Sequence, residues 1–209
     1  MENLEHLVYS REVIEFAAVA NEFCKLLEAP GNMTGLQFLK IEQKLMPLLY
    51  YKTLMVPAPD PVLEDAGEKF VTEEDWALID QNVMSLLGEA NDFMEVFDER
   101  ISESDGPVVG RISENFADIY QDLKDFLVAY NIGTTEIMND ALWYCLENFR
   151  LYWGQKLVNI LRAVHYALDD PDKIGTSDNQ TKKSASKGPD TSGWFISKRQ
   201  DEFRKKDDE

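Results

Sequence analysis

Three aspartates in the segment ADIYQDLKDF, Asp118, Asp122 and Asp125, are spaced four and three residues apart. In an α-helix this spacing places all three carboxylates on one face. Mg²⁺ and Mn²⁺ accept carboxylate oxygens as ligands, provided that a second helix contributes more of them. Glu12 and Glu15 are the candidates for that second set. The row is therefore a candidate metal site, although we prefer the simpler interpretation of a solvated acidic face.

A second set of polar side chains recurs every three or four residues between residues 152 and 166. Its members are Tyr152, Gln155, Asn159, Arg162 and Tyr166. Together they could line a ligand pocket. The alternative, which we prefer, is a half-buried seam hydrogen-bonded to neighbouring helices and loops, because buried amide and guanidinium groups need partners.

The charge balance predicts where the basic residues of this region go. The chain has 39 acidic and 21 basic residues and a net charge of −18. We therefore expect Arg150, Lys156 and Arg162 to pair with carboxylates from other helices, above all with the aspartate row at 118, 122 and 125.

Several kinds of catalytic centre find no support in the sequence. Two histidines and two cysteines form no zinc-binding cluster, and no glycine-rich phosphate loop is present. Cys24 and Cys145 lie among apolar neighbours, which favours reduced core thiols over a disulfide. We name no catalytic residue and no cofactor, and we favour a protein that is not an enzyme.

Hydrophobic periodicity predicts an all-α helical bundle. The expected helices cover approximately residues 9–28, 34–54, 72–97, 112–132 and 135–168, the last being one long C-terminal central helix. Ser10, Thr34 and Thr72 are the expected N-caps, with Gln37 completing a capping box. Pro47 should kink or break the second helix. The proline-rich connection 55–70 should be extended, and we expect no strand.

The sequence divides into a bundle domain, residues 1–170, and a flexible tail, residues 171–209. Low hydrophobicity and many Ser, Thr, Lys and Gly residues predict disorder in the tail. Trp194, Phe195 and Ile196 interrupt it, and basic residues follow within the segment 193–206. We expect this segment either to fold back on the bundle or to bind another protein.

Composition also limits the partners. A strongly negative surface repels nucleic acids and anionic membranes and favours basic protein partners. The sequence has neither an apolar stretch long enough to span a membrane nor the apolar segment of a signal peptide at its N-terminus. These features favour a cytoplasmic location and a basic cytoplasmic protein as partner.

Three segments resemble a known family. They are ANEFCKLLE (20–28), ADIYQDLKDFLVAY (117–130) and WYCLENFRLYWGQKLVNILRA (143–163). Together they resemble an uncharacterised bacterial, Bacteroidetes-type family of all-helical proteins described as a domain of unknown function. The resemblance covers residues 8–168 and implies a soluble bacterial protein, without an activity.

The first functional hypothesis is therefore a non-enzymatic protein-interaction or regulatory module. The alternative is a small-ligand-binding protein or a metal-dependent hydrolase that uses the polar row at 152–166 and the three aspartates.

Overall fold

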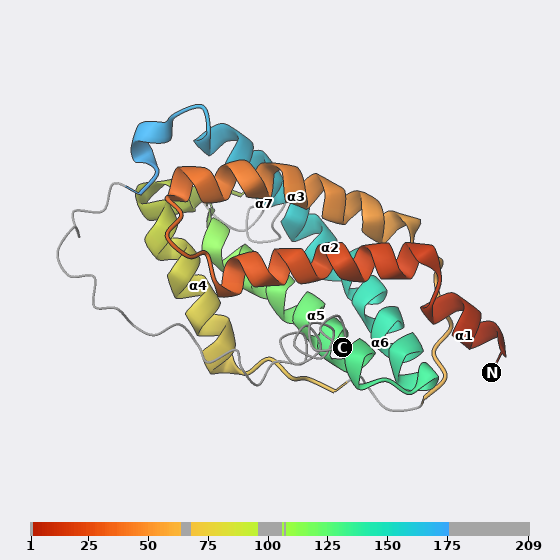
Figure 1. Cartoon of the computed structure of the whole chain (residues 1–209). Helices are drawn as coiled ribbons and strands as arrows, with labels where there is room; N and C mark the ends of the chain where they lie inside the picture. The colour runs from red at the N-terminus through yellow and green to blue at the C-terminus, as the bar shows by residue number, and fades with distance from the viewer. Residues whose placement is uncertain (1, 64–67, 96–105, 107, 176–209) are drawn as a thin grey trace, which may run out of the picture. The chain divides into compact units, whose positions relative to one another are not determined.

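The computed structural model describes residues 2–63, 68–95, 106 and 108–175. The compact unit of the chain covers residues 1–177, and residues 178–209 lie outside the described part. This unit is a helical bundle (Figure 1). Its α-helices are α1 (Glu2–Val8), α2 (Arg11–Glu28), α3 (Gly35–Met55), α4 (Glu73–Leu87), α5 (Ile112–Ile132), α6 (Thr135–Asn148) and α7 (Gly154–Ala167). This confirms the predicted fold class.

The predicted N-caps start their helices as expected. The Ser10 hydroxyl accepts a hydrogen bond from the backbone N–H of Val13 at the start of α2. Thr34 and Gln37 form the predicted capping box, in which each side chain accepts from the other residue's backbone N–H, at 3.2 and 2.9 Å. Such caps satisfy backbone donors that the first turn of a helix leaves without partners.

Pro47 does not break the second helix, because α3 runs without interruption from Gly35 to Met55. Proline lacks an N–H, so the carbonyl four residues earlier loses its usual partner. Pro47 lies on an exposed face, where water can hydrate that carbonyl. The predicted break is therefore wrong.

The third predicted helix ends about ten residues early, at Leu87. Gly88 follows with a φ of 58°, a left-handed conformation that glycine adopts at low cost. A short 3₁₀ turn, η1 (Gly88–Asn91), leads into β1 (Asp92–Met94), which pairs antiparallel with β2 (Val109–Arg111). Phe93 lies opposite Gly110 in this hairpin. The expectations of helix at Phe93 and of no strand are wrong, and Phe97 lies outside the described residues.

The long C-terminal helix is confirmed, with one irregular turn inside it. A π turn, η3 (Phe149–Trp153), joins α6 to α7, and a second 3₁₀ turn, η4 (Pro171–Lys173), follows α7. The indole N–H of Trp153 donates to the carbonyl oxygen of Cys145 at 3.0 Å. One face of this long helix is open, with Leu151 of η3 and Val158 of α7 exposing 70% and 46% of their surface. The helix predicted to be central is therefore not covered along that face.

The core lies where α5 meets the other helices. Helix α5 packs against α2, α4, α6 and α7. Helices α2 and α3 run side by side (Figure 1). Phe116 of α5 contacts Phe23 of α2 and Phe38 of α3, with ring centroids 5.8 and 5.6 Å apart. Aromatic rings of this size contribute much of a core's stability. None of the described helices is long and apolar enough to cross a membrane.

Candidate functional site

The three aspartates of the predicted row hold three different parts of the fold to α5. Asp118 accepts hydrogen bonds from the Trp76 indole at 2.9 Å and the Tyr152 hydroxyl at 3.0 Å, and it pairs with Lys156 at 2.8 Å. Asp122 and Asp125 are each only 8% exposed. The preferred expectation of a solvated acidic face is therefore wrong. As a metal site the row remains a prediction, and among the described residues no group of three or more Asp, Glu, His or Cys side chains is placed to hold a metal ion.

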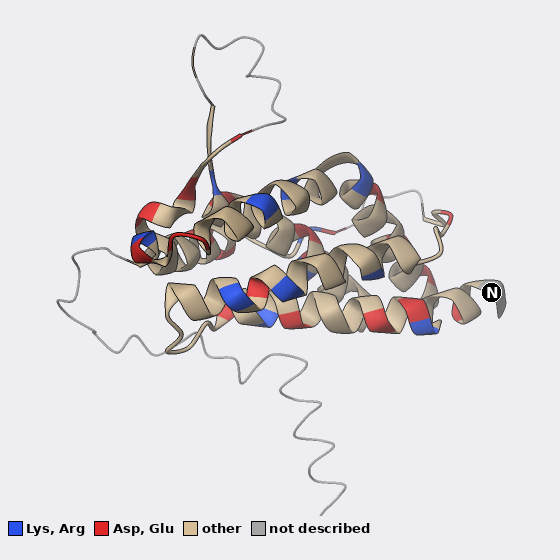
Figure 2. Ribbon diagram, turned by 90° about the horizontal axis from the view of Figure 1, so that it is seen from above, with Lys and Arg blue, Asp and Glu red and all other residues tan. Residues whose placement is uncertain are grey.

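The three bases expected to pair with this row behave differently from one another. Lys156 pairs with Asp118, as predicted. Arg150 pairs with Glu147 of its own helical run at 2.7 Å, so the expectation of a partner on another helix is wrong. Arg162 is exposed and forms no ion pair with the residues that the structure describes. Acidic and basic positions lie close together on some of the helices in Figure 2, such as α2, where Arg11 pairs with Glu15.

Asp140 of α6 fixes the first part of the connection between α3 and α4. Its two carboxylate oxygens accept the backbone N–H groups of Val62 and Leu63, at 2.8 and 2.6 Å. Beside it, the Asn139 amide donates to the carbonyl oxygen of Asp60 at 2.7 Å. An extended segment has few internal partners for its backbone, and these side chains satisfy it.

Asp125 of α5 fixes the last part of the same connection. Its Oδ1 accepts the backbone N–H groups of Phe70 and Val71, at 2.7 and 2.9 Å. The connection is thus pinned to α6 before residues 64–67, which lie outside the described part, and to α5 after them. We call the described parts, residues 56–63 and 68–71, the strap.

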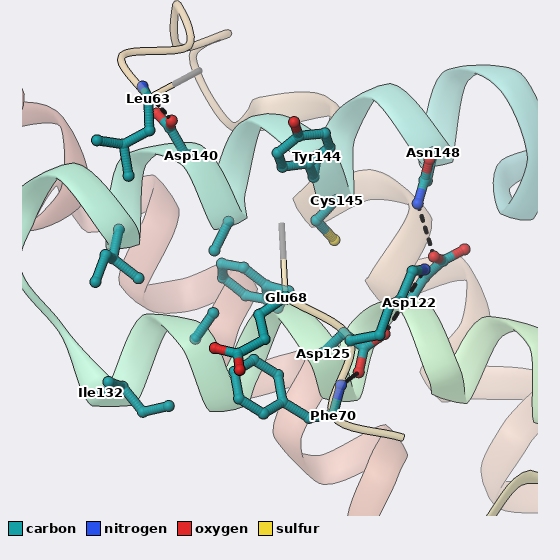
Figure 3. Close-up of a pocket in the computed structure, with 15 residues that line it drawn as sticks. Leu63, Glu68, Phe70, Asp122, Asp125, Ile132, Asp140, Tyr144, Cys145 and Asn148 are labelled. Carbon is teal, nitrogen blue, oxygen red and sulfur yellow. Dashed lines mark hydrogen bonds and ion pairs between the residues drawn. The ribbon is translucent and has the colours of Figure 1, made fainter. Parts of the chain in front are cut away.

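The strap, α5 and α6 enclose a cavity of about 350 Å³ (Figure 3). The lining residues are Leu63, Glu68, Lys69, Phe70, Asp122, Asp125, Phe126, Ala129, Ile132, Ile137, Asp140, Ala141, Tyr144, Cys145 and Asn148. Asp122, Asp125 and Asn148 lie together on one side in Figure 3, whereas Leu63 and Ile132 lie on the other. We call the side with Asp122 and Asp125 the carboxylate end. Asp140 lies beside Leu63 on the other side, so that side combines a carboxylate with apolar residues.

One oxygen at the carboxylate end has no hydrogen bond. Asp125 Oδ2 is buried and has no hydrogen-bond partner, and the nearest positive charge is Lys69 Nζ at 3.7 Å. Asp122 is better supported, since the Asn148 amide donates to its Oδ1 at 2.7 Å. Burial raises the pKa of Asp122, while the Asn148 hydrogen bond opposes that shift. A buried carboxylate oxygen without a hydrogen bond destabilises the folded protein. A ligand that donates a hydrogen bond to it would recover part of that free energy.

The thiol in the cavity lining does not suit nucleophilic catalysis. Cys145 is the one thiol among the described lining residues, and burial raises its pKa far above the usual range, so it stays protonated. His165 lies outside the cavity lining, and its Nδ1 is 3.2 Å from the side-chain amide of Gln43. The described lining residues therefore include no histidine that could activate this thiol.

The polar row expected to line a ligand pocket is only partly brought together. Asn159, Arg162 and Tyr166 line a second cavity, of about 450 Å³, beside the β1–β2 hairpin. Tyr152 instead donates to Asp118, and Gln155 is exposed. The half-buried seam fits Asn159, whose amide donates to Glu95 at 3.1 Å, but not the exposed Gln155, Arg162 and Tyr166. Ligand binding by this row remains a prediction.

The other predicted site residues lie outside the described part of the chain. These are Trp194, Phe195 and Ile196, the expected partner-binding segment of the tail. Conversely, the sequence reasoning missed Asp140 and the strap that it anchors. A buried-looking acid between Met138 and Leu142 was the available signal, because an acid in an apolar helical pattern needs a donor from elsewhere.

The comparisons with known proteins place the chain in a family. The family described as "Domain of unknown function (DUF5063)" matches residues 7–170. A crystal structure of protein BF1032 from Bacteroides fragilis is similar, with 41% sequence identity and a TM-score of 0.67 over 76% of this chain and 93% of that one. No curated protein matches. The chain belongs to the DUF5063 family, as the three resembling segments indicated, and neither likeness brings an activity with it.

Proposed function

We propose that this protein is a non-enzymatic binding protein that holds a small organic molecule between α5 and α6. The observation that carries the proposal is the buried Asp125 Oδ2, which accepts no hydrogen bond from the described residues, at one end of an otherwise mainly apolar cavity. Ligand pockets combine apolar walls with a few polar groups that orient the ligand. A volume of about 350 Å³ falls within the range of small-molecule sites, roughly 300–1,000 Å³.

A thermal-shift screen against a mixed library of cationic, neutral and anionic small molecules tests this function. A ligand present at 100 times its Kd stabilises a protein by about 2.7 kcal/mol, which for a chain of this size raises Tm by roughly 5–10 °C. Ala129 is buried in the cavity wall, so Ala129→Met should fill the space and abolish the shift. Ala77→Met, on the exposed face of α4, is the matched control and should keep it.

Two outcomes of the thermal-shift screen would count against the proposal. Compounds that stabilise the wild type and Ala129→Met equally would bind elsewhere. If no compound of any charge stabilises the wild type, the cavity is not a small-molecule site.

A second candidate function, docking of a basic protein, is favoured by the surface of α4. Among its 15 residues α4 has the acids Glu73, Glu74, Asp75 and Asp80 and no Lys or Arg. Leu78 and Met84 are exposed on the same helix. Acidic residues beside exposed apolar ones suit a partner helix with basic and apolar faces. Pull-downs at moderate salt with Leu78→Asp should then lose a basic partner that the wild type retains.

A further inference from the structure

We propose that the α5–α6 cavity selects an organic monocation, a primary ammonium group attached to an apolar body. This inference rests on the proposed function and adds the chemical class of the ligand. It follows from the charge of the lining, from the Asp125 oxygen that accepts no hydrogen bond and from the apolar residues in the rest of the lining.

The formal charges around the cavity are predominantly negative. Glu68, Asp122, Asp125 and Asp140 line it, and Lys69 is the single basic residue among the described lining residues. Asp140 is already satisfied by two strap N–H groups. The remaining carboxylates outnumber the one lysine, so the cavity attracts cations and disfavours anions.

The Asp125 carboxylate has one oxygen to which the described residues donate no hydrogen bond. Oδ1 already accepts two strap N–H groups, whereas Oδ2 accepts none. Lys69 Nζ stands 3.7 Å away, beyond hydrogen-bond distance, and 63% of its side chain is exposed. An exposed lysine held this loosely moves aside at little cost. The ammonium of a ligand would then occupy the position that Lys69 only approaches.

An ammonium group matches the groups at this end of the cavity. It has three donors and no acceptor, and the carboxylates of Asp122 and Asp125 are acceptors. A charge-assisted N⁺–H···O⁻ bond is about twice as strong as a neutral one. Asn148 holds Asp122 in place through its amide, so the anionic end is already oriented before a ligand arrives.

The apolar residues of the cavity lining argue for an organic cation over a bare metal ion. Phe70, Phe126, Ala129, Ile132 and Ile137 are lining residues. They offer contacts for a hydrocarbon and no oxygen ligands. Mg²⁺ and Ca²⁺ take six or more oxygen ligands, water included, and the described residues provide no cluster for a metal ion. A hydrocarbon chain or ring attached to the ammonium would pack against these apolar residues and contribute hydrophobic binding energy.

Three probes of the same shape separate the classes of ligand. Phenethylammonium is the cation, 2-phenylethanol its neutral analogue and 3-phenylpropanoate an anionic analogue. Isothermal titration calorimetry of the full chain with each probe should give the cation at least tenfold tighter binding than the alcohol, and no measurable binding of the carboxylate. Tighter binding of the alcohol or the carboxylate than of the ammonium would overturn the inference.

Two substitutions with opposite expected effects test the geometry. Asp125→Asn keeps an oxygen for the strap N–H groups and replaces Oδ2 with a donor, so phenethylammonium should bind at least tenfold more weakly. Lys69→Ala removes the positive charge that competes for Asp125, so phenethylammonium should bind this variant about threefold more tightly, or better. Glu74→Gln, an exposed site on α4, controls for net charge and should leave binding within twofold.

The results also separate this inference from the proposed function. Suppose that the anionic probe binds the wild type and that Lys69→Ala abolishes this binding. The cavity is then a ligand site for the opposite charge, and only the ligand class fails. If Asp125→Asn does not fold, Asp122→Asn and Lys69→Ala provide the same test. Should no probe bind the wild type and the library screen also find no ligand, both the function and the ligand class fail.

Discussion

Glu42 is a carboxylic acid buried in the core, and it provides the sharpest test of the electrostatics in this structure. It is fully buried on α3, and neither of its carboxylate oxygens has a hydrogen-bond partner. Burial raises its pKa well above the usual 4.5. The folded protein therefore keeps a proton on Glu42 at pH values where the unfolded chain has released it.

The sign and size of the effect follow from linkage. Above the unfolded pKa the folded state binds more protons than the unfolded state, so stability falls as pH rises, until the pH passes the raised folded pKa. Each pH unit in this window costs about 1.4 kcal/mol. A carboxyl group still protonated at pH 7 would by then have lost about 3 kcal/mol relative to pH 4.5.

Two substitutions divide this cost into its parts. Glu42→Gln cannot titrate, so its advantage over the wild type should be small near pH 4.5 and should grow to as much as about 3 kcal/mol by pH 7. Glu42→Met also removes the unpartnered polar atoms and should add about 1–3 kcal/mol at every pH. Other groups with raised pKa values, such as Glu28, are present in all three proteins and cancel in the difference.

Urea unfolding between pH 4.5 and 8, followed by circular dichroism, measures these differences. Glu74→Gln removes an exposed charge and should stay within about 0.5 kcal/mol of the wild type at each pH. A Glu42→Gln advantage that does not change with pH would refute the reasoning, because it would mean that the folded carboxyl group titrates like the unfolded one.

Three further predictions follow from other contacts. Asp140→Asn turns one of the two strap acceptors into a donor, so it should cost about 2–3 kcal/mol in urea unfolding and speed amide hydrogen exchange at residues 62 and 63; unchanged exchange would show that the strap does not depend on this anchor. Gly154→Ala would place a Cβ 2.4 Å from the Phe149 carbonyl oxygen at the π turn and should destabilise by about 1–3 kcal/mol, whereas an unchanged midpoint in urea would contradict the close contact. Burial raises the pKa values of Cys24 and Cys145, so an aromatic disulfide reagent should modify them only after unfolding, and rapid labelling of the native protein would count against their burial.

The features that could be predicted from sequence depend on neighbouring residues. The Ser10 and Thr34 caps involve groups three residues apart, and the spacing of apolar residues reports the buried face of each helix. The end of α4 was open to the same reasoning, because Gly88 interrupts the periodic pattern. Apolar residues continue with helical spacing past this glycine, so periodicity alone predicts a helix that extends to residue 97.

The candidate site could not be predicted because its contacts join residues far apart in the chain. Asp125 bonds to backbone groups 54 and 55 residues away, and Asp140 to groups 77 and 78 residues away. Backbone N–H groups carry no residue-specific signal, so no pattern in the sequence shows which carboxylate they will meet. The spacing at 118, 122 and 125 correctly indicated one shared face and left the partners of that face unspecified.

That shared face explains why an acidic chain places its carboxylates on the most buried helix. Asp118 joins α4 and α7 to α5, Asp122 accepts from α6, and Asp125 accepts from the strap. Each carboxylate binds donors of a different element, so together they fix the positions of four elements around α5. Three carboxylates provide more acceptor positions than these donors fill, and Asp125 Oδ2 is the buried oxygen that has none. The position that gives the cavity its affinity for a cation is therefore a consequence of how the fold is held together, so Asp125→Asn should weaken binding of a cation while the strap keeps its anchor.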